Sequence, residues 1–380
     1  MRVAVVAETF LPQMNGVTHS LLRILDHLAA RGDDAVILAP GADQQPTTVS
    51  GFPVVRLPSV AVPSYPDVRL ATAGLNRVTR LLRRFSPDVV HLASPFVLGW
   101  QGVRAAESLG LPAVSIYQTD VPAYAARYGL PAAEPALWSH VRRLHARSTV
   151  TLAPSASAMT LLADHGIERL ALWGRGVDSV RFSPARRSHA LRSSWAAPGE
   201  RVVGYVGRLA AEKQVDDLRV LQAIPGVRLV IVGDGPLRAS LQTALPTARF
   251  LGFLDGERLA EAVASFDVFA HPGESETFGQ TIQEAMASGV PVVATGSGGP
   301  VDLVDSSRNG WLYRPGDLAD LRARVEDLTG DDAKRRAFGL AARRSVEPRS
   351  WPELCARLVE HYEAALTMGA VDLRRSPVPR

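Results

Sequence analysis

This sequence has few of the residues that build disulfides and metal sites. Among 380 residues there is a single cysteine, Cys355, which excludes an internal disulfide and a zinc site made of cysteines. The nearest pair of histidines, His140 and His145, is five residues apart, and on a helix this spacing turns the two side chains away from each other. The sequence therefore predicts a metal-free protein that works in a reducing compartment.

Long apolar runs are also missing. No stretch reaches the roughly 18 to 20 apolar residues that a membrane span requires. The apolar run near the start of the chain holds five residues before Glu8 and is shorter than the apolar part of a signal peptide. We therefore expect a cytoplasmic protein, either soluble or attached peripherally to the inner face of the plasma membrane.

Lysine is scarce, since Lys213 and Lys334 are the only two in the chain. The net charge of +4 and the isoelectric point of about 9.5 therefore come from arginine. A genome that favours arginine codons accounts for this, and so does affinity for an anionic partner such as phosphate or a lipid surface. Composition alone leaves both explanations open.

Short apolar strands alternate with amphipathic stretches along the whole chain, which is typical of parallel sheets covered by helices. Proline and glycine mark the joints between the elements. The sequence thus predicts an α/β protein with two doubly wound sheets. The expected strands are 2–7, 34–39, 53–58, 88–93, 112–117, 150–155, 201–207, 227–233, 248–252, 268–273, 290–295 and 310–315.

The segment 173–195 breaks this alternation and precedes a new strand, so we place the hinge between two domains there. We expect an N-terminal domain over 1–180 and a C-terminal domain over 181–348. A helix over 349–366 with an apolar stripe and a tail over 367–380 complete the chain. Because open parallel sheets bind ligands beyond the carboxyl ends of their strands, two such domains facing each other would form one cleft.

Charged residues and glycines follow several predicted strands. Asn15-Gly16 comes after the first strand and opens a helix, where a glycine lets the backbone approach a ligand closely. Arg208 and Lys213 follow the strand at 201–207. Two cations in one strand–loop–helix connection suit a diphosphate, because charged hydrogen bonds to phosphate contribute about 1.5 to 3 kcal/mol each. Plain loop residues and surface ion pairs are the alternatives.

The stretch "HPGESETFGQTIQEAMASGVPVVA", 271–294, places Glu276 and Glu284 around a strand-to-helix corner. The backbone N–H groups of Phe278, Gly279 and Gln280 are expected to point from the start of that helix into the cleft. Carboxylates repel phosphate, but they accept two hydrogen bonds from the vicinal hydroxyls of a sugar or ribose. The pattern therefore indicates a sugar-nucleotide site.

"GRLAAEK" followed by "ESETFGQTIQEAMASGVPVVA" resembles the retaining, nucleotide-sugar-dependent glycosyltransferases of family 4, which have the GT-B fold. The resemblance covers residues 1–366 and is greatest to actinobacterial GDP-mannose-dependent α-mannosyltransferases that act on glycolipids. It implies two Rossmann-like domains around a central cleft, with the closing helix crossing back to the N-terminal domain. It also implies GDP-mannose as the donor substrate, and neither a cofactor nor a divalent ion.

The same resemblance assigns roles to individual residues. Arg208 and Lys213 would hold the donor diphosphate, which Gly16 would let the N-terminal loop approach. Glu276 and the backbone from Phe278 to Gln280 would hold the transferred hexose, and Glu284 the ribose. The list of residues expected to act in catalysis is Glu276, Arg208, Lys213, Gln118 and Asp120.

Position 118 departs from the family pattern. Many members have a histidine just after the strand at 112–117, and this chain has Gln118. A glutamine hydrogen-bonds a sugar hydroxyl but does not titrate. Asp120 would then take part of the role, or the leaving phosphate itself would accept the proton. The second alternative agrees with the mechanism usually described for the family.

The acceptor is expected on the N-terminal domain. "RVTRLLRRF", 77–85, is a basic helix with Arg77, Arg80, Arg83 and Arg84, preceded by an apolar loop at 59–68. Such a pair suits weak docking on an anionic membrane that holds a glycolipid acceptor, and a solvated helix face is the alternative. No nucleic-acid partner is expected. A UDP-sugar donor, a soluble acceptor, a sugar-nucleotide epimerase and a non-catalytic sugar-binding protein remain open.

Overall fold

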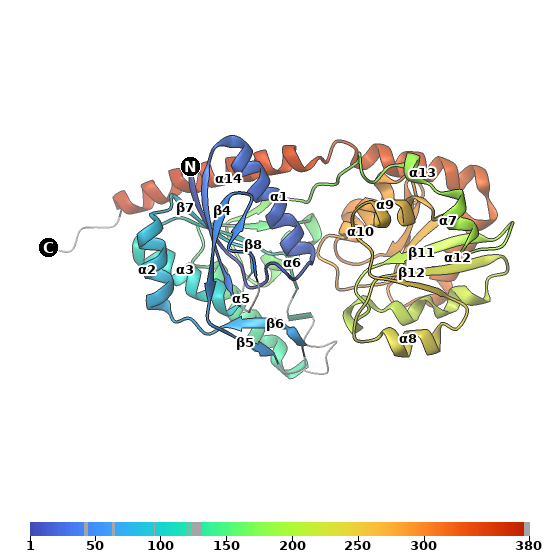
Figure 1. The fold of residues 1–380 in the computed structure, drawn as a ribbon, viewed down its shortest axis with the longest axis horizontal. Coiled ribbons are helices and arrows are strands. Elements are labelled where there is room, and N and C mark those ends of the chain that lie inside the picture. The colour runs from blue at the N-terminus through green and yellow to red at the C-terminus, as the bar shows by residue number, and fades with distance from the viewer. Residues whose placement is uncertain (42–44, 63–64, 95, 121, 124–130, 376–380) are drawn as a thin grey trace. The chain divides into compact units, whose positions relative to one another are not determined.

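The computed structural model describes residues 1–41, 45–62, 65–94, 96–120, 122–123 and 131–375 (Figure 1). The chain divides into two compact units. The N-terminal unit contains Met1–Pro122, Ala133–Arg175 and the last helix from Trp351 onward, and the C-terminal unit contains Gly176–Ser350 with the segment Ala123–Ala132. Each unit is built around one main parallel sheet, so the predicted α/β class with two Rossmann-like sheets is confirmed.

The sheet of the N-terminal unit has the strand order β10-β9-β8-β7-β1-β2-β4-β3. All neighbours pair in parallel except β3 and β4. The inner strands read as unbroken apolar runs because both faces of the sheet are covered. The strands are β1 Arg2–Val6, β2 Asp34–Pro40, β3 Thr48–Val49, β4 Phe52–Leu57, β7 Val89–Leu92, β8 Ala113–Ile116, β9 Val150–Ala153 and β10 Leu170–Leu172.

Helices pack on both faces of this sheet (Figure 1). One core cluster joins α1 and α14 to the sheet, and a second joins α2 and α3 to the other face. The helices are α1 Gly16–Arg31, α2 Leu75–Phe85, α3 Val97–Leu109, α5 Glu134–His145, α6 Ala156–Asp164 and α14 Trp351–Arg375, with a 3-10 turn, η1, at Pro131–Ala133.

The last helix differs from its predicted length. α14 runs from Trp351 to Arg375, nine residues past the predicted end at 366, so most of the expected tail is helical. No proline stands between Pro352 and Pro377 to stop it. Within the N-terminal unit, α14 packs beside α1, and the Tyr362 hydroxyl lies 2.5 Å from His91 Nδ1 in the core.

The segment predicted as an apolar loop at 59–68 is also different. Its described residues belong to two antiparallel strands, β5 Ser59–Val62 and β6 Tyr65–Ala71, which form a sheet of their own. Pro66 made a strand improbable from sequence, because proline lacks the N–H that a ladder needs. A two-stranded ribbon tolerates this residue, since every strand in it has a free edge.

The sheet of the C-terminal unit has the order β13-β12-β11-β14-β15-β16, and all neighbours are parallel. Its strands are β11 Arg201–Val206, β12 Val227–Val232, β13 Arg249–Gly252, β14 Val268–His271, β15 Val292–Thr295 and β16 Gly310–Tyr313.

Two core clusters again cover the two faces of this sheet, one with α9, α10 and α13 and one with η4, α8 and α12. Where a helix was expected after the strand at 201–207, the chain forms two consecutive 3-10 segments, η3 Ala211–Lys213 and η4 Val215–Ala223. The other elements are η2 Pro184–Arg186, α7 His189–Ser193, α8 Arg238–Ala244, α9 Gly256–Ala264, α10 Gln280–Ala287, α11 Pro300–Leu303, α12 Leu318–Gly330 and α13 Asp332–Val346.

Both sheets have a point where the strand order reverses. In the C-terminal unit the chain moves outward from β11 through β12 to β13 and then returns to place β14 on the other side of β11. In the N-terminal unit the reversal lies between β1 and β7. Ligands of open α/β sheets bind at such reversals, beyond the carboxyl ends of the strands. The loops after β11 and β14 are therefore the first place to look for a site.

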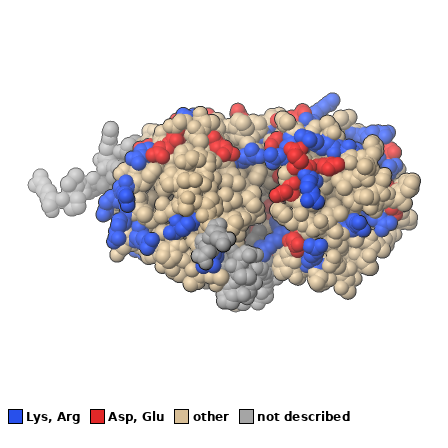
Figure 2. All heavy atoms as spheres, in the orientation of Figure 1, with Lys and Arg blue, Asp and Glu red and all other residues tan. Residues whose placement is uncertain are grey.

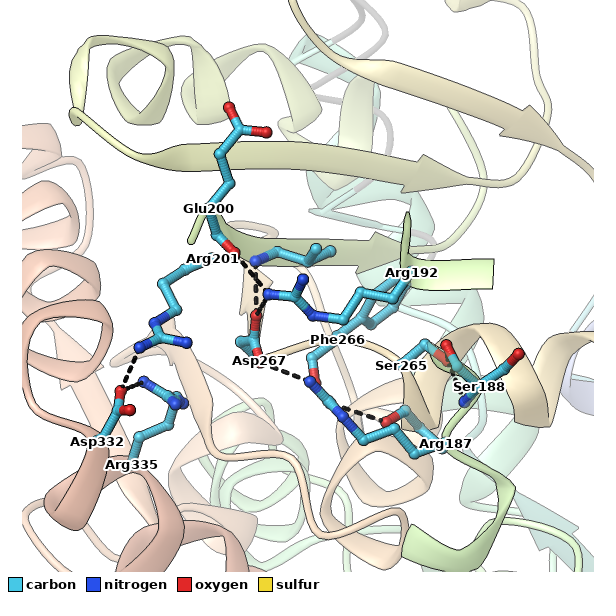
Figure 3. Close-up of polar contacts among 12 residues, drawn as sticks. Arg187, Ser188, Arg192, Glu200, Arg201, Ser265, Phe266, Asp267, Asp332 and Arg335 are labelled. Carbon is cyan, nitrogen blue, oxygen red and sulfur yellow. Dashed lines mark hydrogen bonds and ion pairs between the residues drawn. The ribbon is translucent and has the colours of Figure 1, made fainter. Parts of the chain in front are cut away.

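At the amino ends of the strands of the C-terminal sheet lies an ion-pair network around Asp267, which directly precedes β14 (Figure 3). Its buried carboxylate accepts hydrogen bonds from Arg187 Nη2 and Arg192 Nη2, both at 2.7 Å, and from Val202 N at 2.8 Å. Arg187 and Arg192 come from the connecting segment that begins this unit. The network thus fixes that segment to the amino ends of the strands.

Candidate active site

The loop that follows β11 carries the two cations predicted to bind a diphosphate. It leaves the sheet at Gly207, whose N–H donates to Val232 O at 3.0 Å. The Tyr205 hydroxyl donates to Arg208 O at 3.2 Å. The Arg208 side chain is exposed, whereas Lys213, at the end of η3, is 18% exposed. Both cations therefore lie on one loop at the carboxyl edge of the sheet, beside the reversal of strand order.

Two glycines after β12 support this loop. A Cβ on Gly233 would lie 1.9 Å from Gly207 O, and one on Gly235 would lie 2.5 Å from Leu209 O. No real side chain fits at such distances, so only glycine allows the two loops to pack this closely. The Gly-Asp-Gly turn therefore has a packing role, which is to support the backbone that carries Arg208.

The loop after β14 brings Glu276 to Lys213. The Lys213 ammonium lies 2.7 Å from Glu276 Oε2, and His271 Nε2 lies 3.6 Å from the same oxygen. The other oxygen, Oε1, accepts from Gly279 N at 3.1 Å and from Phe278 N at 3.4 Å. Two of the three amides expected to point toward a ligand at the start of α10, those of Phe278 and Gly279, thus donate to Glu276 itself, because a helix N-terminus attracts the nearest anion.

The environment of Glu276 keeps its carboxylate charged. Burial favours the neutral acid, but the Lys213 ammonium and the hydrogen bond and charge of His271 together hold the pKa of Glu276 well below its usual value. The side chain is 17% exposed. Glu276 is therefore an ionised, oriented carboxylate that keeps access to the surface, as a ligand for sugar hydroxyls would require.

A further loop, after β15, supports Glu276 from behind. Gly299 N donates to Glu276 O at 2.7 Å, and a Cβ on Gly298 would lie 2.3 Å from that same carbonyl oxygen. A Cβ on Gly299 would meet the Phe278 backbone at 2.4 Å. This pair was not predicted from the sequence, although "GSGGP" directly after a buried strand is the signal for such a close approach.

Glu284 lies in the second turn of α10 and has a different electrostatic state. Gln280 Nε2 donates to Glu284 Oε1 at 3.3 Å and to Gly176 O at 3.2 Å. Burial raises the pKa of Glu284 to about 7, although the bond from Gln280 and the charge of Arg181 oppose the shift. The two glutamates of the motif therefore differ, since one is held as a carboxylate and the other is near its titration point at neutral pH.

The N-terminal unit gathers a second group of predicted residues at the carboxyl edge of its own sheet. Gln118 follows β8 and is buried, and its Oε1 accepts from Arg175 Nη2 at 2.9 Å. Gly16 begins α1, which Asn15 caps through its side chain. Asp120 is half-buried two residues beyond Gln118. Arg175 was not predicted as a site residue, because it lies in the segment without periodicity.

Glu8 is a second residue that the sequence analysis did not place at a site. It follows β1 and is 4% exposed, and its Oε2 accepts from Leu98 N at 2.6 Å at the start of α3. Burial raises the pKa of Glu8 to about 7, against the opposing backbone N–H groups of Leu98, Gly99 and Ala71. The sequence "VAETF" shows a carboxyl group two residues after the end of β1. It does not show that this group is buried.

Within the described ranges, no three His, Cys, Asp or Glu side chains come together in a way that could hold a metal ion. None of the helices in the same part of the chain is long and apolar enough to cross a bilayer.

The basic helix is confirmed as α2. Figure 2 shows basic side chains gathered along the edge of the N-terminal unit where α2 lies. Val78 and Leu82 are buried against the sheet, and the four arginines Arg77, Arg80, Arg83 and Arg84 are exposed. The helix contains no acidic residue. α2 thus presents a positively charged surface.

Two family descriptions match consecutive parts of the chain. Residues 14–181 match Glycosyltransferase Family 4, and residues 189–345 match Glycosyl transferases group 1. The first range covers the N-terminal sheet except for β1, and the second covers the whole C-terminal sheet. The first includes Gly16 and Gln118, and the second includes Arg208, Lys213 and both glutamates.

Individual proteins match over nearly the full length. The chain is 50% identical over 370 residues to the GDP-mannose-dependent alpha-mannosyltransferase of Mycolicibacterium smegmatis, covering 96% of this chain and 98% of that one. It is 45% identical over 372 residues to the protein of the same name from Corynebacterium glutamicum, covering 97% and 90%.

A solved structure has the same fold. The sucrose-phosphate synthase of Thermosynechococcus elongatus superposes with a TM-score of 0.82 at 19% identity, over 96% of this chain and 99% of that one. The chain therefore belongs to the GT-B glycosyltransferases, in the group described as family 4 and group 1 glycosyl transferases.

Proposed function

We propose that this protein transfers α-mannose from GDP-mannose to a glycolipid acceptor, with retention of configuration at the transferred carbon. The observation that carries the proposal is the Lys213–Glu276 pair, which lies where the strand order of the C-terminal sheet reverses. The chain is also 50% identical to a protein named GDP-mannose-dependent alpha-mannosyltransferase. A cation and a fixed carboxylate side by side suit a ligand with a charged diphosphate next to a polyhydroxylated ring.

Lys213 and Arg208 are proposed to hold the donor diphosphate. Lysine is a compact point charge with three N–H groups, so its ammonium can bind a phosphate oxygen while it stays next to Glu276. Arg208 is exposed on the same loop and adds a second positive charge. Stabilising the leaving diphosphate is the main electrostatic requirement of the reaction, since negative charge accumulates there as the glycosidic bond breaks.

Glu276 is proposed to bind the transferred hexose, and Glu284 the ribose. An ionised carboxylate accepts hydrogen bonds only, and its two oxygens match two neighbouring hydroxyls. Glu276 has this state because of Lys213 and His271. Glu284 is next to Gln280, whose side chain adds an amide beside the carboxyl group. Glu276 lies in the loop before α10 and Glu284 in the second turn of that helix, so the two side chains can contact separate rings of one donor.

The acceptor proton needs no protein base in this proposal. Gln118 cannot titrate, and a phosphate oxygen of the leaving group can accept the proton from the attacking hydroxyl. The cations Arg208 and Lys213 take the charge-stabilising role that a divalent ion has in other enzymes, so we propose a metal-independent reaction.

The decisive experiment is a donor screen with the purified protein and a lipid extract, using GDP-mannose, UDP-glucose and UDP-N-acetylglucosamine in EDTA. The proposal predicts α-mannosylated lipid from GDP-mannose alone. A product from a UDP-sugar would contradict the donor, and a product confined to the aqueous phase would contradict the acceptor. Interconversion of nucleotide sugars without an acceptor would indicate an epimerase, and no turnover at all would indicate a binding protein.

The exposed arginines of α2 are proposed to dock the protein weakly on an anionic membrane. Juxtamembrane basic residues contribute about 1 kcal/mol each near an anionic surface, and salt screens this attraction. We expect salt-sensitive co-sedimentation with vesicles that contain anionic lipid. The test replaces Arg77, Arg80, Arg83 and Arg84 by serine.

A matched control removes the same charge from exposed sites of the C-terminal unit, namely Arg308, Arg314, Arg336 and Arg344. Equal sedimentation of wild type and the α2 variant would contradict the docking role. Equal loss in both variants would assign the binding to net charge alone.

A further inference from the structure

Arg175 is a buried cation that no role above requires. It is 7% exposed and lies just after Trp173, whose backbone N–H donates to Ala153 O and whose indole Nε1 donates to Leu354 O, both at 2.8 Å. The backbone that leads to Arg175 is therefore fixed to the core of the N-terminal unit. Burying a guanidinium is expensive unless it is well hydrogen-bonded, so a charge at this position needs an explanation.

Arg175 meets two of the predicted site residues. Its Nη2 donates to Gln118 Oε1 at 2.9 Å. Its Nη1 occupies the space beside Gly16, because a Cβ at that position would lie 2.7 Å from this nitrogen. Three loops, which follow β1, β8 and β10, thus converge on one guanidinium at the carboxyl edge of the sheet.

The contact with Gly16 changes the interpretation of this glycine. The resemblance to family 4 glycosyltransferases implied that Gly16 lets the N-terminal loop approach the donor diphosphate. The structure supplies a separate reason for a glycine, which is that any side chain there would displace Arg175. The two explanations are distinguishable, because only the second depends on the arginine.

The contact with Arg175 determines the orientation of the Gln118 side-chain amide, that is, whether its oxygen or its NH₂ group faces the guanidinium. A glutamine amide can rotate by a half-turn and exchange its oxygen for its NH₂ group. A guanidinium carries five N–H donors and no acceptor, so the Gln118 oxygen must face Arg175. The NH₂ group is then turned the other way, where Nε2 lies 3.5 Å from Ala93 O at the end of β7. Gln118 is thereby oriented as a donor.

We propose that Arg175 is a positioning residue for the transfer reaction. It orients Gln118 so that an amide N–H group donates to an oxygen of the reacting phosphate or sugar, and Gly16 is a glycine because the guanidinium fills the adjoining space. This inference rests on the proposed function, since it concerns the rate of the same transfer.

The first test compares three substitutions that keep the size of the side chain. Arg175→Met removes the donors, and we expect kcat to fall about 10-fold or more, with a change of less than about 3-fold in KM for GDP-mannose. Arg175→Lys restores a donor and should recover part of the rate. Gln118→Glu keeps the contact with Arg175 as an ion pair but removes the N–H groups, so the rate should fall about as far while the melting temperature is maintained.

A purely structural arginine gives the opposite pattern. Rates measured well below the melting temperature would then be normal in all three variants, and Gln118→Glu would be as active as wild type. Either result would overturn the proposal.

The second test is a double-mutant cycle. Gly16→Ala should slow transfer in the wild-type background and have almost no further effect in Arg175→Met, because the guanidinium that it displaces is already absent. If the two substitutions instead reduce the rate by independent factors, Gly16 acts on the ligand and not through Arg175, which would contradict the proposed link. Failure of the wild type to transfer mannose would contradict the proposed function, whereas an active wild type with independent effects contradicts only this inference.

Discussion

In the C-terminal unit, an ion pair with a carboxylate lies at each end of the strands: one at their amino ends and one at their carboxyl ends. The two pairs are of the same kind but serve different purposes. At the amino edge, Asp267 is ionised because two arginines and a backbone N–H overcome the effect of burial on its pKa. At the carboxyl edge, Glu276 is ionised because of Lys213 and His271. The shortest ion-pair distance is 2.7 Å in both cases. Distance and charge state therefore do not distinguish a structural carboxylate from a candidate ligand.

Exposure and the nature of the partners do distinguish them. The Asp267 side chain is 5% exposed, and Arg187 is fixed further by donating to Ala264 O and Phe266 O (Figure 3). Glu276 is 17% exposed, and its charged partner Lys213 is a single flexible ammonium. The Asp267 carboxylate is thus enclosed by the protein, although its partners Arg187 and Arg192 are 33% and 16% exposed. In the second network both Glu276 and Lys213 are partly exposed, which leaves access for a ligand.

The largest effect is expected at the closed edge. Asp267→Ala leaves Arg187 and Arg192 without their carboxylate, and breaking a buried pair in this way destabilises a protein by about 3 to 5 kcal/mol. Denaturant unfolding measures this loss. Turnover at a low, permissive temperature should be unchanged.

The control for this prediction is Asp332→Ala. Asp332 pairs with Arg201 and Arg335 at the same 2.7 Å but is 43% exposed, so the loss of stability should be much smaller. Similar losses from both substitutions would show that burial is not what separates these networks.

The next largest effect is expected at the open edge, and on rate. Glu276→Gln keeps the size of the side chain but removes its charge, so the hydroxyls of the hexose lose a carboxylate acceptor. Loss of one oriented polar group in an active site typically lowers kcat by about 100-fold or more. The melting temperature should change far less than in Asp267→Ala. A rate and a melting temperature that fall together would make Glu276 a structural residue.

The sequence predicted the α/β class, the family and the fold, and all three are confirmed. Buried parallel strands can be recognised in a sequence as unbroken apolar runs. Because the strands are parallel, the loops that follow them all lie at the carboxyl ends of the strands. The site residues stay predictions, although Lys213 and Glu276, 63 positions apart, do meet.

Features that depend on contact between distant segments were not predictable. Arg175 and Glu8 look like ordinary charged loop residues, and their burial follows only from the packing of neighbouring loops. Gly298 and Gly299 read as a flexible turn until the backbone of the Glu276 loop is placed against them. Local pattern also failed at Pro66, which belongs to β6 but lies where the register shifts, between the pairs Ala61–Arg69 and Val62–Tyr65.

A smaller effect concerns Glu284 and pH. Its folded pKa of about 7 lies above the ordinary value of 4.5, so the neutral acid stabilises the fold at low pH and this share is lost as pH rises to about 7. Donor binding should show the opposite trend, because a ribose diol donates best to a carboxylate. We expect KM for the donor to fall about 3- to 10-fold between pH 6 and pH 8.

Glu284→Gln provides the control, since it should make KM independent of pH over this range. Glu8, whose pKa is also about 7, contributes to the stability trend with the same sign. The stability profile of the variant should therefore be flatter than that of wild type without becoming level. A wild-type KM that is constant from pH 6 to pH 8 would contradict the role of Glu284 in holding the ribose.

The smallest effect is expected from an exposed ion pair of nearly the same length. Arg322 Nε lies 2.8 Å from Glu326 Oε1 on α12, and both side chains are 42% exposed. Water competes for such a pair, so Glu326→Gln should change stability by no more than about 0.5 kcal/mol and leave turnover as it is. Denaturant unfolding and initial rates check both statements. If this substitution matched Glu276→Gln in rate, general loss of negative charge would explain both results, and the partly buried position of Glu276 would have no special role.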